Sequence, residues 1–382
     1  MGSEKALVVA ALAGFIGTFL EHDIALLQER GYEVHCAGNV SGYKNEETMA
    51  RFEKIGTVFH RIDFASRSPL SKQNMVAFKQ IRKLLKEHKY DVIHCHTPIP
   101  GVIVRLAAFP YRRKGTKVIY TSHGFFFHKG SGKKEWLIYH TIEKIMSAFG
   151  DAIITINNED YEVVKKMFSK KVFHINGVGC NIKKYQDVEV NRSEKRKSLG
   201  ISDSQIMILD VGELSKRKNH SIVIEALGEI KDPNLVLVIC GKAIEGSGTY
   251  ESLKKLAEEL RVNVIFAGHR MDVPELCHCA DFGVLPSTRE GLGMSAIEMM
   301  STGLPLVTSN VHGIKDYMIQ GKTGYMCDPY DKKQFAEGIR SLCSVDTREE
   351  MKAHCIASAE RFDQRVSFAQ MKEIYDDILM NE

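Results

Sequence analysis

The sequence predicts an α/β protein made of two Rossmann-like domains, each a doubly wound parallel sheet. Three observations predict it: a length of 382 residues, apolar runs that do not alternate with polar residues, and helical patterns between these runs. A chain of this length is too long for one ordinary core and suits two domains. Continuous Val/Ile/Leu runs are typical of strands that are covered on both faces, as in parallel sheets.

The first half of the chain alternates between strand-like and helix-like patterns. A buried strand is expected at 6–12, a helix at 18–30, which Gly31 ends, and a second strand at 33–37. The alternation continues with helices at 72–88, 101–109 and 134–149 and strands at 91–94, 117–121 and 152–156. This pattern predicts a doubly wound domain over residues 1–176.

The rhythm breaks near Gly177-Val178-Gly179 and then restarts. Strands are expected at 206–211, 236–240, 264–267, 282–285 and 306–308, and helices at 218–229, 250–260, 273–279, 294–301 and 332–342. These elements predict a second domain over residues 177–366. A last helical pattern, 367–379, has no strand after it, and we expect residues 367–382 to pack back toward the first domain.

The strongest functional motif lies at 286–298, where a strand ends and a Gly-containing turn leads into a helix near Met294. A helix N-terminus presents unpaired N–H groups and the positive end of a dipole, so this turn can hold a diphosphate. Glu290 and Glu298 flank that anion site and can accept hydrogen bonds from sugar hydroxyls. The alternative for Glu290 is a carboxylate that merely caps the helix.

Composition and charge exclude several classes of protein. The net charge of +4 is too small for a general polyanion binder. The nine cysteines include no C-x-x-C pair, so we expect reduced thiols and no structural metal. No apolar run approaches the roughly 20 residues of a membrane span, and the first residues lack the order of a signal peptide. We therefore expect a cytoplasmic protein.

The motifs resemble those of glycosyltransferase family four, whose retaining members have the two-lobed GT-B architecture. Glu290 and Glu298 match its E-x7-E motif, and 211–219, 303–307 and 313–324 continue the pattern. The motifs at 94–98 and 120–125 resemble those of capsule and exopolysaccharide enzymes. The resemblance covers essentially the whole chain. It implies two domains facing across a cleft and transfer of a hexosyl or N-acetylhexosaminyl group from a UDP-sugar in bacterial surface polysaccharide biosynthesis.

The resemblance also implies roles for residues of the second domain. Glu298 binds the ribose hydroxyls, Glu290 binds the donor sugar, and Lys218 neutralises the leaving diphosphate after the strand that ends at Val211-Gly212. The backbone N–H groups that hold the diphosphate are those of Leu292, Gly293 and Met294. A fixed cation can stabilise the developing charge. Because the sequence contains no Asp-x-Asp motif, we expect no metal and no cofactor.

Glu213 departs from the family pattern, since many relatives carry an arginine at this position, beside the diphosphate. A glutamate cannot replace that cation. Three explanations stay open: Lys218 suffices alone, Lys216, Arg217 or another cation substitutes, or the Glu213 side chain faces elsewhere.

Candidates in the first domain also follow expected strands. Gly14 and Gly17 open a helix after the first strand and, by the resemblance, lie over the donor phosphates; close helix–strand packing is the alternative. His123 follows the strand at 117–121 and is expected to contact the donor sugar as a catalytic residue. His94 and His96 are weaker candidates for the acceptor side.

Arg270, in the second domain, follows the strand expected at 264–267. Its position corresponds to the nucleobase side of the donor site in the family, so we expect it near the base.

Residues 111–136 predict contact with an anionic membrane surface. Basic residues occupy 112, 113, 114, 117, 129, 133 and 134, and Phe125-Phe126-Phe127 and Trp136 lie among or beside them. Basic and aromatic residues together are typical of surfaces that bind anionic headgroups. A peripheral location at the inner membrane face would suit an acceptor linked to polyprenyl diphosphate, which the resemblance favours. The alternative is an ordinary solvated face; nucleic acid is not expected, because no nucleic-acid-binding signature accompanies the cluster.

Two other functions fit the same two-lobed architecture. One is a sugar-nucleotide epimerase or a phosphorylase, and the other is a non-catalytic module that binds a nucleotide sugar. The presence of Glu290, Glu298 and Lys218 together favours a transferase over a module without activity.

Overall fold

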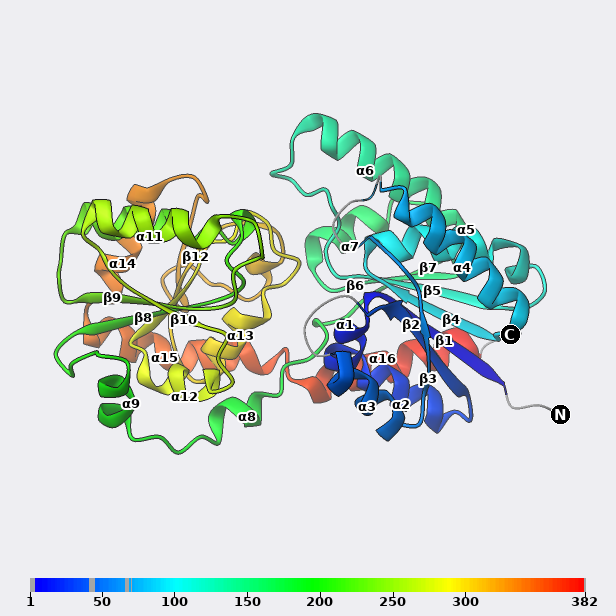
Figure 1. Ribbon diagram of the computed structural model, residues 1–382, viewed down its shortest axis with the longest axis horizontal. Helices are drawn as coiled ribbons and strands as arrows, with labels where there is room; N and C mark the ends of the chain where they lie inside the picture. The colour runs from blue at the N-terminus through cyan, green and yellow to red at the C-terminus, as the bar shows by residue number, and fades with distance from the viewer. Residues whose placement is uncertain (1–3, 41–44, 66–68, 70, 381–382) are drawn as a thin grey trace. The chain divides into compact units, whose positions relative to one another are not determined.

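The computed structural model describes residues 4–40, 45–65, 69 and 71–380 of the chain. The chain forms two compact units, unit 1 of Met1–Gly179 with Arg365–Glu382, and unit 2 of Cys180–Gln364 (Figure 1). The boundaries expected from the sequence, 176/177 and 366/367, lie three residues before and two residues after the observed divisions.

Unit 1 contains a seven-stranded parallel sheet with the order β3-β2-β1-β4-β5-β6-β7. Its strands are β1 (Lys5–Leu12), β2 (Glu33–Asn39), β3 (Val58–Arg61), β4 (Val92–His96), β5 (Lys117–Ser122), β6 (Ala152–Thr155) and β7 (Lys171–His174). Strands are added outward from β1 in one direction and from β4 in the other, so the order reverses between β1 and β4. Ligands of doubly wound sheets bind at such a switch point, beyond the carboxyl ends of the strands.

Helices cover both faces of this sheet (Figure 1). They are α1 (Ala13–Phe19), α2 (Glu21–Glu29), α3 (Asn45–Lys54), α4 (Gln73–Glu87), α5 (Pro98–Arg112), α6 (Lys133–Met146), α7 (Asn158–Val164) and α16 (Gln364–Leu379), with a 3-10 turn, η1, at Ser147–Phe149. The single helix expected at 18–30 is instead two helices, α1 and α2, which separate at the buried Leu20.

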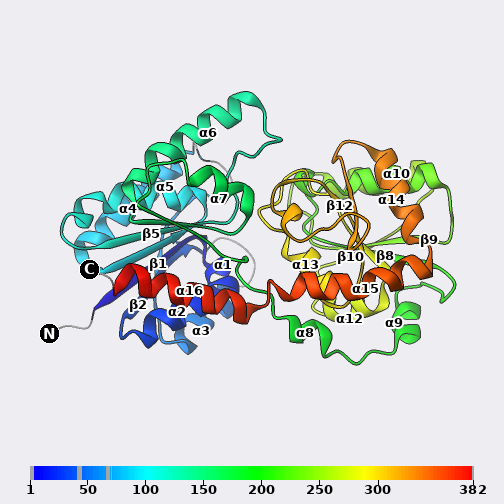
Figure 2. The same ribbon diagram turned by 180° about the vertical axis from the view of Figure 1, so that it is seen from behind.

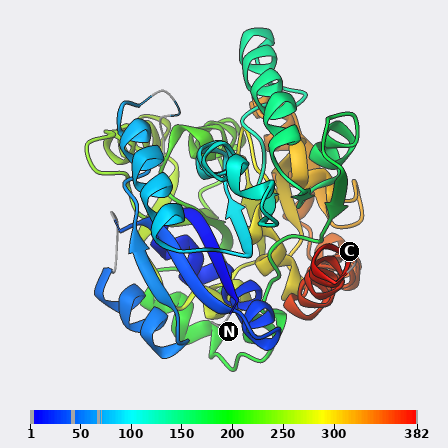
Figure 3. The same cartoon turned by 90° about the vertical axis from the view of Figure 1, so that its right-hand side faces the viewer.

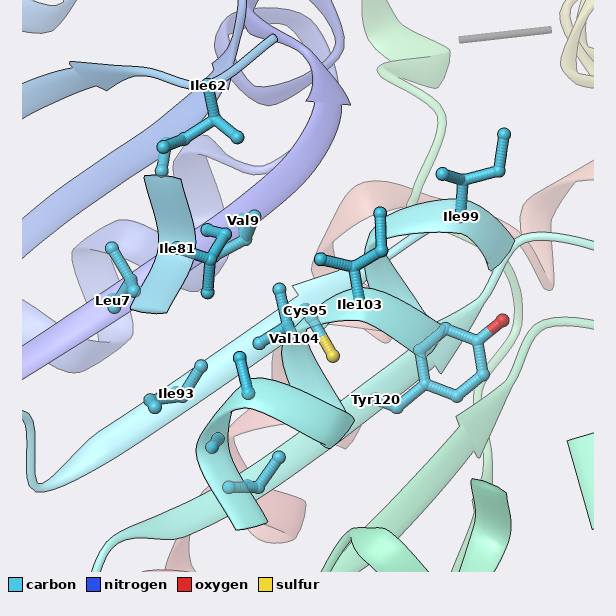
Figure 4. Close-up of a cluster of buried hydrophobic side chains, with 14 of the residues drawn as sticks. Leu7, Val9, Ile62, Ile81, Ile93, Cys95, Ile99, Ile103, Val104 and Tyr120 are labelled. Atoms are coloured by element: carbon cyan, nitrogen blue, oxygen red, sulfur yellow. The ribbon is translucent and has the colours of Figure 1, made fainter. Parts of the chain in front are cut away.

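The core of unit 1 lies between the sheet and the helices α4 and α5. Leu7, Ile93 and Val104 are fully buried together, and the ring of Tyr120 in β5 packs in the same cluster (Figure 4). A Cβ atom at Gly101 in α5 would overlap this ring, so α5 can approach β5 closely only because residue 101 is glycine. This packing fixes α5 against the strands whose ends carry the candidate histidines.

The C-terminal helix α16 makes its contacts within unit 1 (Figure 2). The hydroxyl of Tyr375 lies 2.7 Å from Nδ1 of His94 in β4. Two residues further along the helix, the carboxylate of Asp377 accepts from the ammonium of Lys171 in β7 at 3.0 Å. The last helix of the chain therefore packs against the domain formed by the first 179 residues and belongs to it.

Unit 2 contains a six-stranded parallel sheet with the order β10-β9-β8-β11-β12-β13. Its strands are β8 (Ile206–Val211), β9 (Leu235–Cys240), β10 (Asn263–Gly268), β11 (Phe282–Leu285), β12 (Leu306–Ser309) and β13 (Gly324–Cys327). The strand order reverses between β8 and β11. The loops that follow these two strands contain Lys218 and Glu290.

The helices of unit 2 include four short ones and several longer ones. They are α8 (Ile182–Gln186), α9 (Arg192–Ser198), α10 (His220–Ile230), α11 (Thr249–Leu260), α12 (Val273–Cys279), α13 (Met294–Ser301), α14 (Lys332–Leu342) and α15 (Val345–Glu360), with 3-10 turns η2 (Lys216–Lys218) and η3 (His312–Asp316). Among the residues that the structure describes in both units, no helix is both long enough and apolar enough to cross a membrane.

Replacing Tyr375 with phenylalanine should destabilise unit 1. The substitution leaves Nδ1 of the fully buried His94 without its tyrosine partner, which typically costs about 1–3 kcal/mol. Urea unfolding of Tyr375→Phe measures the loss, and Tyr330→Phe is the matched control because Tyr330 is 79% exposed. Equal midpoints for Tyr375→Phe and the wild type would contradict this role.

Candidate functional site

Two loops of unit 2 meet at the switch point between β8 and β11. The N–H of Thr288 donates to the carbonyl of Arg217 at 2.9 Å, and Nη1 of Arg217 donates to the carbonyl of Arg289 at 3.1 Å. The side-chain amide of Asn219 donates to the carbonyl of Pro286 at 3.2 Å. These bonds tie the loop after β8 to the loop after β11.

The centre of this arrangement is the carboxylate of Glu290. It accepts from Nη1 of Arg217 at 2.8 Å and from Nζ of Lys218 at 3.1 Å. Burial would raise the pKa of Glu290, but Lys218 and Arg217 outweigh it and hold this pKa below its ordinary value. Glu290 is therefore ionised, and two cations lie together at the place where the sequence predicted a diphosphate site.

Gly293 leads into α13 with a backbone that favours glycine. Its φ is +86°, and a Cβ atom there would lie 3.0 Å from Cγ of Glu290 and from the hydroxyl of Tyr317. As the N-cap residue of α13 it offers no side chain, so no side-chain oxygen caps the first N–H groups of the helix. The hydroxyl of Ser295, in the first turn, has no hydrogen-bond partner in the part of the chain that the structure describes. The uncapped N–H groups at the start of α13 can therefore bind an anion.

Gly212, directly after β8, makes room for Lys218. A Cβ atom at residue 212 would lie 3.0 Å from Cε and 3.4 Å from Nζ of Lys218. The lysine stem therefore lies along the backbone of Gly212, and its ammonium is directed to Glu290.

The structure shows which cation accompanies Lys218 and where Glu213 points. Lys216 is exposed, whereas Arg217 contacts both Glu290 and, at 3.8 Å, the carboxylate of Glu213. The backbone carbonyl of Glu213 lies 3.0 Å from Nε2 of His220. The Glu213 side chain, 42% exposed, therefore faces Arg217, and of the two candidates next to Lys218 it is Arg217 that lies in the site.

His220 supports this loop as a buried cation. Its Nδ1 lies 2.7 Å from the carboxylate of Asp210, and its Nε2 faces the carbonyl of Glu213, so both nitrogens have acceptors. Burial acts to lower the pKa of His220, but Asp210 reverses the direction and raises it above the ordinary value. The charged imidazole holds the backbone of residue 213 in place.

Glu298 lies one turn inside α13 and meets a residue that sequence reasoning missed. Burial raises the pKa of Glu298, and a hydrogen bond with Tyr185 partly offsets the rise. Tyr185 comes from α8, just after the segment where the strand–helix rhythm breaks. A single tyrosine on a short helix forms no sequence motif, so Tyr185 could not be identified from the sequence.

Arg270 is not brought into contact with these residues. It follows β10, which is the edge strand of the sheet and is separated from β8 by β9. Its Nε donates to the carboxylate of Asp272 at 2.7 Å, and Nζ of Lys195 lies 2.5 Å from the same carboxylate. The expected role at the nucleobase stays a prediction.

In unit 1 the helix α1 begins immediately after β1 and carries both glycines of the weak G-x-x-G motif. A Cβ atom at Gly14 would meet no atom within 4 Å, so packing does not require glycine there. Gly17 is buried in α1. The alternative of close helix–strand packing therefore has no support at Gly14.

A chain of polar groups lies at the carboxyl end of β4 and β5. Nδ1 of His96 is 3.1 Å from Nε2 of His123, and Nε2 of His96 is 3.8 Å from the carboxylate of Asp23 in α2. Burial lowers the pKa of His123 to about 3 and raises that of Asp23 to about 7. Asp23, His96 and His123 line a small cavity together with Phe19 and Phe368. Burial also lowers the pKa of His96, so the imidazoles of His96 and His123 are both neutral at pH 7.

His94 has a different position from the one expected. It lies within β4, is fully buried, and has Tyr375 at Nδ1 and Thr121 at Nε2, both at 2.7 Å. Both nitrogens of His94 are hydrogen-bonded inside unit 1, which favours a packing role for this residue; a contact of one of the two histidines with an acceptor stays a prediction. His96, next but one along the strand, lines the cavity instead.

Part of the segment predicted to face a membrane is interior. Phe125 and Phe127 are each 1% exposed and belong to the core of unit 1, so they cannot insert into lipid. Arg112 forms an ion pair with Asp151, with Nη2 and Oδ1 2.6 Å apart. Sequence reasoning grouped these residues by proximity along the chain, whereas packing under the loop after β5 buries the two rings.

The exposed apolar surface of this region is on α6. Ile138, Ile142 and Ile145 are exposed at helical spacing on one face, with Leu137 beside them. In Figure 1 and Figure 3 the first turns of α6 extend beyond the neighbouring helices of unit 1. Ile138 and Ile142 also line a groove that continues to Ile99 and Ile103 of α5 and to Phe126.

Both units match known protein families. Residues 17–176 match the family described as Glycosyltransferase Family 4, and residues 191–362 match the one described as Glycosyl transferases group 1. The protein EpsD of Bacillus subtilis (strain 168), named as a glycosyltransferase, is 34% identical over 364 residues, which cover 91% of this chain and 90% of EpsD.

A second relative has a more specific name, UDP-Gal:alpha-D-GlcNAc-diphosphoundecaprenol alpha-1,3-galactosyltransferase of Escherichia coli. It is 27% identical over 321 residues, 81% of each chain. A relative named for capsular polysaccharide biosynthesis, the glycosyltransferase CapM of Staphylococcus aureus, is 25% identical over 324 residues, which cover 81% of this chain and 84% of CapM.

Among solved structures, Alr3699/HepE of Anabaena, in complex with UDP and glucose, superposes with a TM-score of 0.79 at 18% identity and covers 98% of this chain and 100% of its own. That likeness agrees with the two parallel sheets described above. The chain therefore belongs to the GT-B glycosyltransferases of family four and is a glycosyltransferase of polysaccharide biosynthesis.

Proposed function

We propose that the chain transfers a hexosyl or N-acetylhexosaminyl group from a UDP-sugar, with retention, to a saccharide carried on polyprenyl diphosphate. The observation that carries the proposal is the pair of cations, Arg217 and Lys218, held on Glu290 beside the uncapped start of α13. Free N–H groups and fixed positive charge are what a diphosphate requires. UDP bound to HepE and UDP-galactose in the name of the Escherichia coli relative support a UDP-sugar.

In this proposal the departing UDP is stabilised by the protein itself. Arg217 and Lys218 move their hydrogen bonds from Glu290 to the diphosphate, which neutralises the charge that develops as the glycosidic bond breaks. The freed Glu290 then accepts from the donor sugar, and Glu298 accepts from the ribose. The leaving phosphate takes the proton of the acceptor hydroxyl on the same face of the sugar, which gives retention. Because two cations and a helix end serve the diphosphate, we propose that no metal takes part.

Unit 1 contributes neutral groups to this reaction. His123 is deprotonated at pH 7, so its imidazole can exchange hydrogen bonds with a sugar hydroxyl without adding charge. We propose that the open backbone at Gly14, in the first turn of α1, approaches the donor phosphates as in the family.

The acceptor is proposed to be bound at a membrane. The relative from Escherichia coli acts on a saccharide linked to diphosphoundecaprenol, which supports a lipid-linked acceptor. The exposed face of α6 combines Leu137, Ile138 and Ile145 with Lys133 and Lys134 at its start, and such a helix suits an anionic lipid surface. This face replaces the buried phenylalanines as the apolar part of the membrane contact.

An acceptor requirement separates this function from an epimerase or phosphorylase. A transferase should release UDP from a UDP-sugar only slowly until a saccharide diphosphate lipid is added. Epimerised UDP-sugar formed without acceptor would favour the alternative.

Lys218→Ala should lower kcat at least tenfold, because charge stabilisation in such sites is worth about 3 kcal/mol. Arg217→Ala should lower kcat as well, and the double variant more than either. Lys216→Ala is the matched control, since this neighbouring lysine is exposed. Addition of EDTA should leave turnover unchanged. Lys218→Ala within a factor of two of wild type would show that another cation acts on the diphosphate.

Glu298→Ala and Glu290→Ala should have different effects. Glu298 lies next to Tyr185 inside α13 and should affect UDP binding, whereas Glu290 faces the cations and should mainly affect kcat. Calorimetric UDP titration and steady-state kinetics separate the two, with Glu258→Ala on the exposed face of α11 as control. Negligible effects of both substitutions would overturn the site assignment.

Two double substitutions should each release the protein from anionic liposomes: Leu137→Ser with Ile145→Ser, and Lys133→Ser with Lys134→Ser. Each lysine contributes roughly 1 kcal/mol of attraction, which falls with salt. Turnover of a short water-soluble acceptor should survive. Met271→Ser, at a 73% exposed position of unit 2, controls for loss of surface hydrophobicity. Wild-type protein that stays in the supernatant at low salt would disprove the membrane contact.

A further inference from the structure

Three histidines lie together at the β3 edge of the unit 1 sheet. His35 is near the start of β2, His60 is in β3, and His88 is the residue that ends α4. Ala37 is paired with His60 and His35 with Val58, so His35 and His60 project from the same face of the two strands. The glycosyltransferase reaction proposed above uses none of them.

The three imidazoles have the spacing of ligands around one ion. Their ring centroids are 5.0 Å apart for His35 and His60, 5.2 Å for His35 and His88, and 5.3 Å for His60 and His88. With Zn–N bonds of about 2.0–2.1 Å, three imidazoles around a tetrahedral zinc have centroids about 5 Å apart. One possible ligand atom from each residue lies within 4.8 Å of the others, and Nδ1 of His35 and Nε2 of His60 are already 3.0 Å apart. Small side-chain rotations therefore suffice to close the site.

His35 also has the outer partner that metal-binding histidines usually have. Its Nε2 lies 2.9 Å from the carboxylate of Glu33, which in turn accepts from Lys5 at 3.0 Å. A proton on Nε2 leaves the lone pair of Nδ1 directed toward His60 and the Tyr90 hydroxyl. A carboxylate that fixes the tautomer in this way orients the ring and makes the free nitrogen a better ligand.

Two rings of the cluster are in the neutral form that a metal ion requires. Burial lowers the pKa of His60 to about 4 and also lowers that of His35, so both rings are neutral ligands at pH 7. The charged groups that act on these two rings are the carboxylates of Glu33 and Glu87 and the single ammonium of Lys5. His60 and His88 are partly exposed, which gives an ion access from solvent.

We propose that His35, His60 and His88 bind one zinc ion, with a fourth position open to water. The ion joins the edge strand β3 and its neighbour β2 to the end of α4, and none of its ligands belongs to the groups proposed for sugar transfer. A second group, Asp23, His94 and His96, is less suitable because all three of its members are buried, so that an ion would have no access from solvent.

Cobalt substitution tests the site directly. Tag-free full-length protein is stripped with a chelator and titrated with Co2+, whose visible absorption is intense when the ion is four-coordinate. One equivalent should bind with such a spectrum, zinc should displace it, and excess zinc should raise Tm by about 5 °C. His60→Ala and His88→Ala, both at partly exposed positions, should each abolish the spectrum and the shift.

His354→Ala is the matched control, because His354 is an exposed histidine of α15 in unit 2, and it should bind Co2+ like the wild type. Circular dichroism confirms that each variant is folded. The proposal is overturned if no four-coordinate spectrum forms, or if it persists in His60→Ala/His88→Ala. Transfer by stripped protein should equal that of zinc-loaded protein at a temperature where both are folded, so loss of transfer activity in every form would count against the proposed function and not against this site.

Discussion

The geometry of unit 2 depends on one carboxylate. Glu290 accepts from Arg217 and Lys218, which come from the loop after the neighbouring strand, and backbone bonds reinforce the same junction. Two glycines are explained by this contact, since Gly212 leaves space for the lysine stem and Gly293 for the glutamate. Like charges would otherwise separate Arg217 from Lys218, so the carboxylate keeps both cations together.

The interior strands of both sheets could be predicted, because strands covered on both faces need continuous apolar runs. The strands that sequence reasoning missed, β3, β7 and β13, are all edge strands. An edge strand has one neighbour, and in β3 and β7 all side chains are at least partly exposed, so no buried run marks them. Of the candidate site, the acidic motif was identified from its position after a strand, and Lys218 from the resemblance to family four. Arg217 could be named only as one of several cations, because contact with Glu290 depends on how two distant loops pack.

Unit 1 shows how two histidines of one motif can have different surroundings. His94 and His96 are two positions apart in one strand and look equivalent in sequence, yet His94 is hydrogen-bonded to the C-terminal helix and His96 lines a cavity. The difference comes from α16, nearly three hundred residues later in the chain, and no local pattern contains that information. The burial of Phe125 and Phe127 could not be decided from the sequence for the same reason, since the core that receives them is assembled from segments distant in the chain, among them β4, α4 and α5.

The buried Asp23 couples folding of unit 1 to proton uptake. Burial raises the pKa of this carboxyl from an ordinary 3.8 to about 7, so between about pH 4 and pH 7 the folded chain keeps a proton that the unfolded chain releases. The contribution of Asp23 to the free energy of unfolding is largest below the pKa of the unfolded chain, 3.8. It falls as the pH rises toward the pKa of the folded chain, about 7, and stays constant above it. At neutral pH the aspartate beside His96 therefore exists as a mixture of acid and carboxylate, and the small cavity it lines can take up or give away a proton within the physiological range.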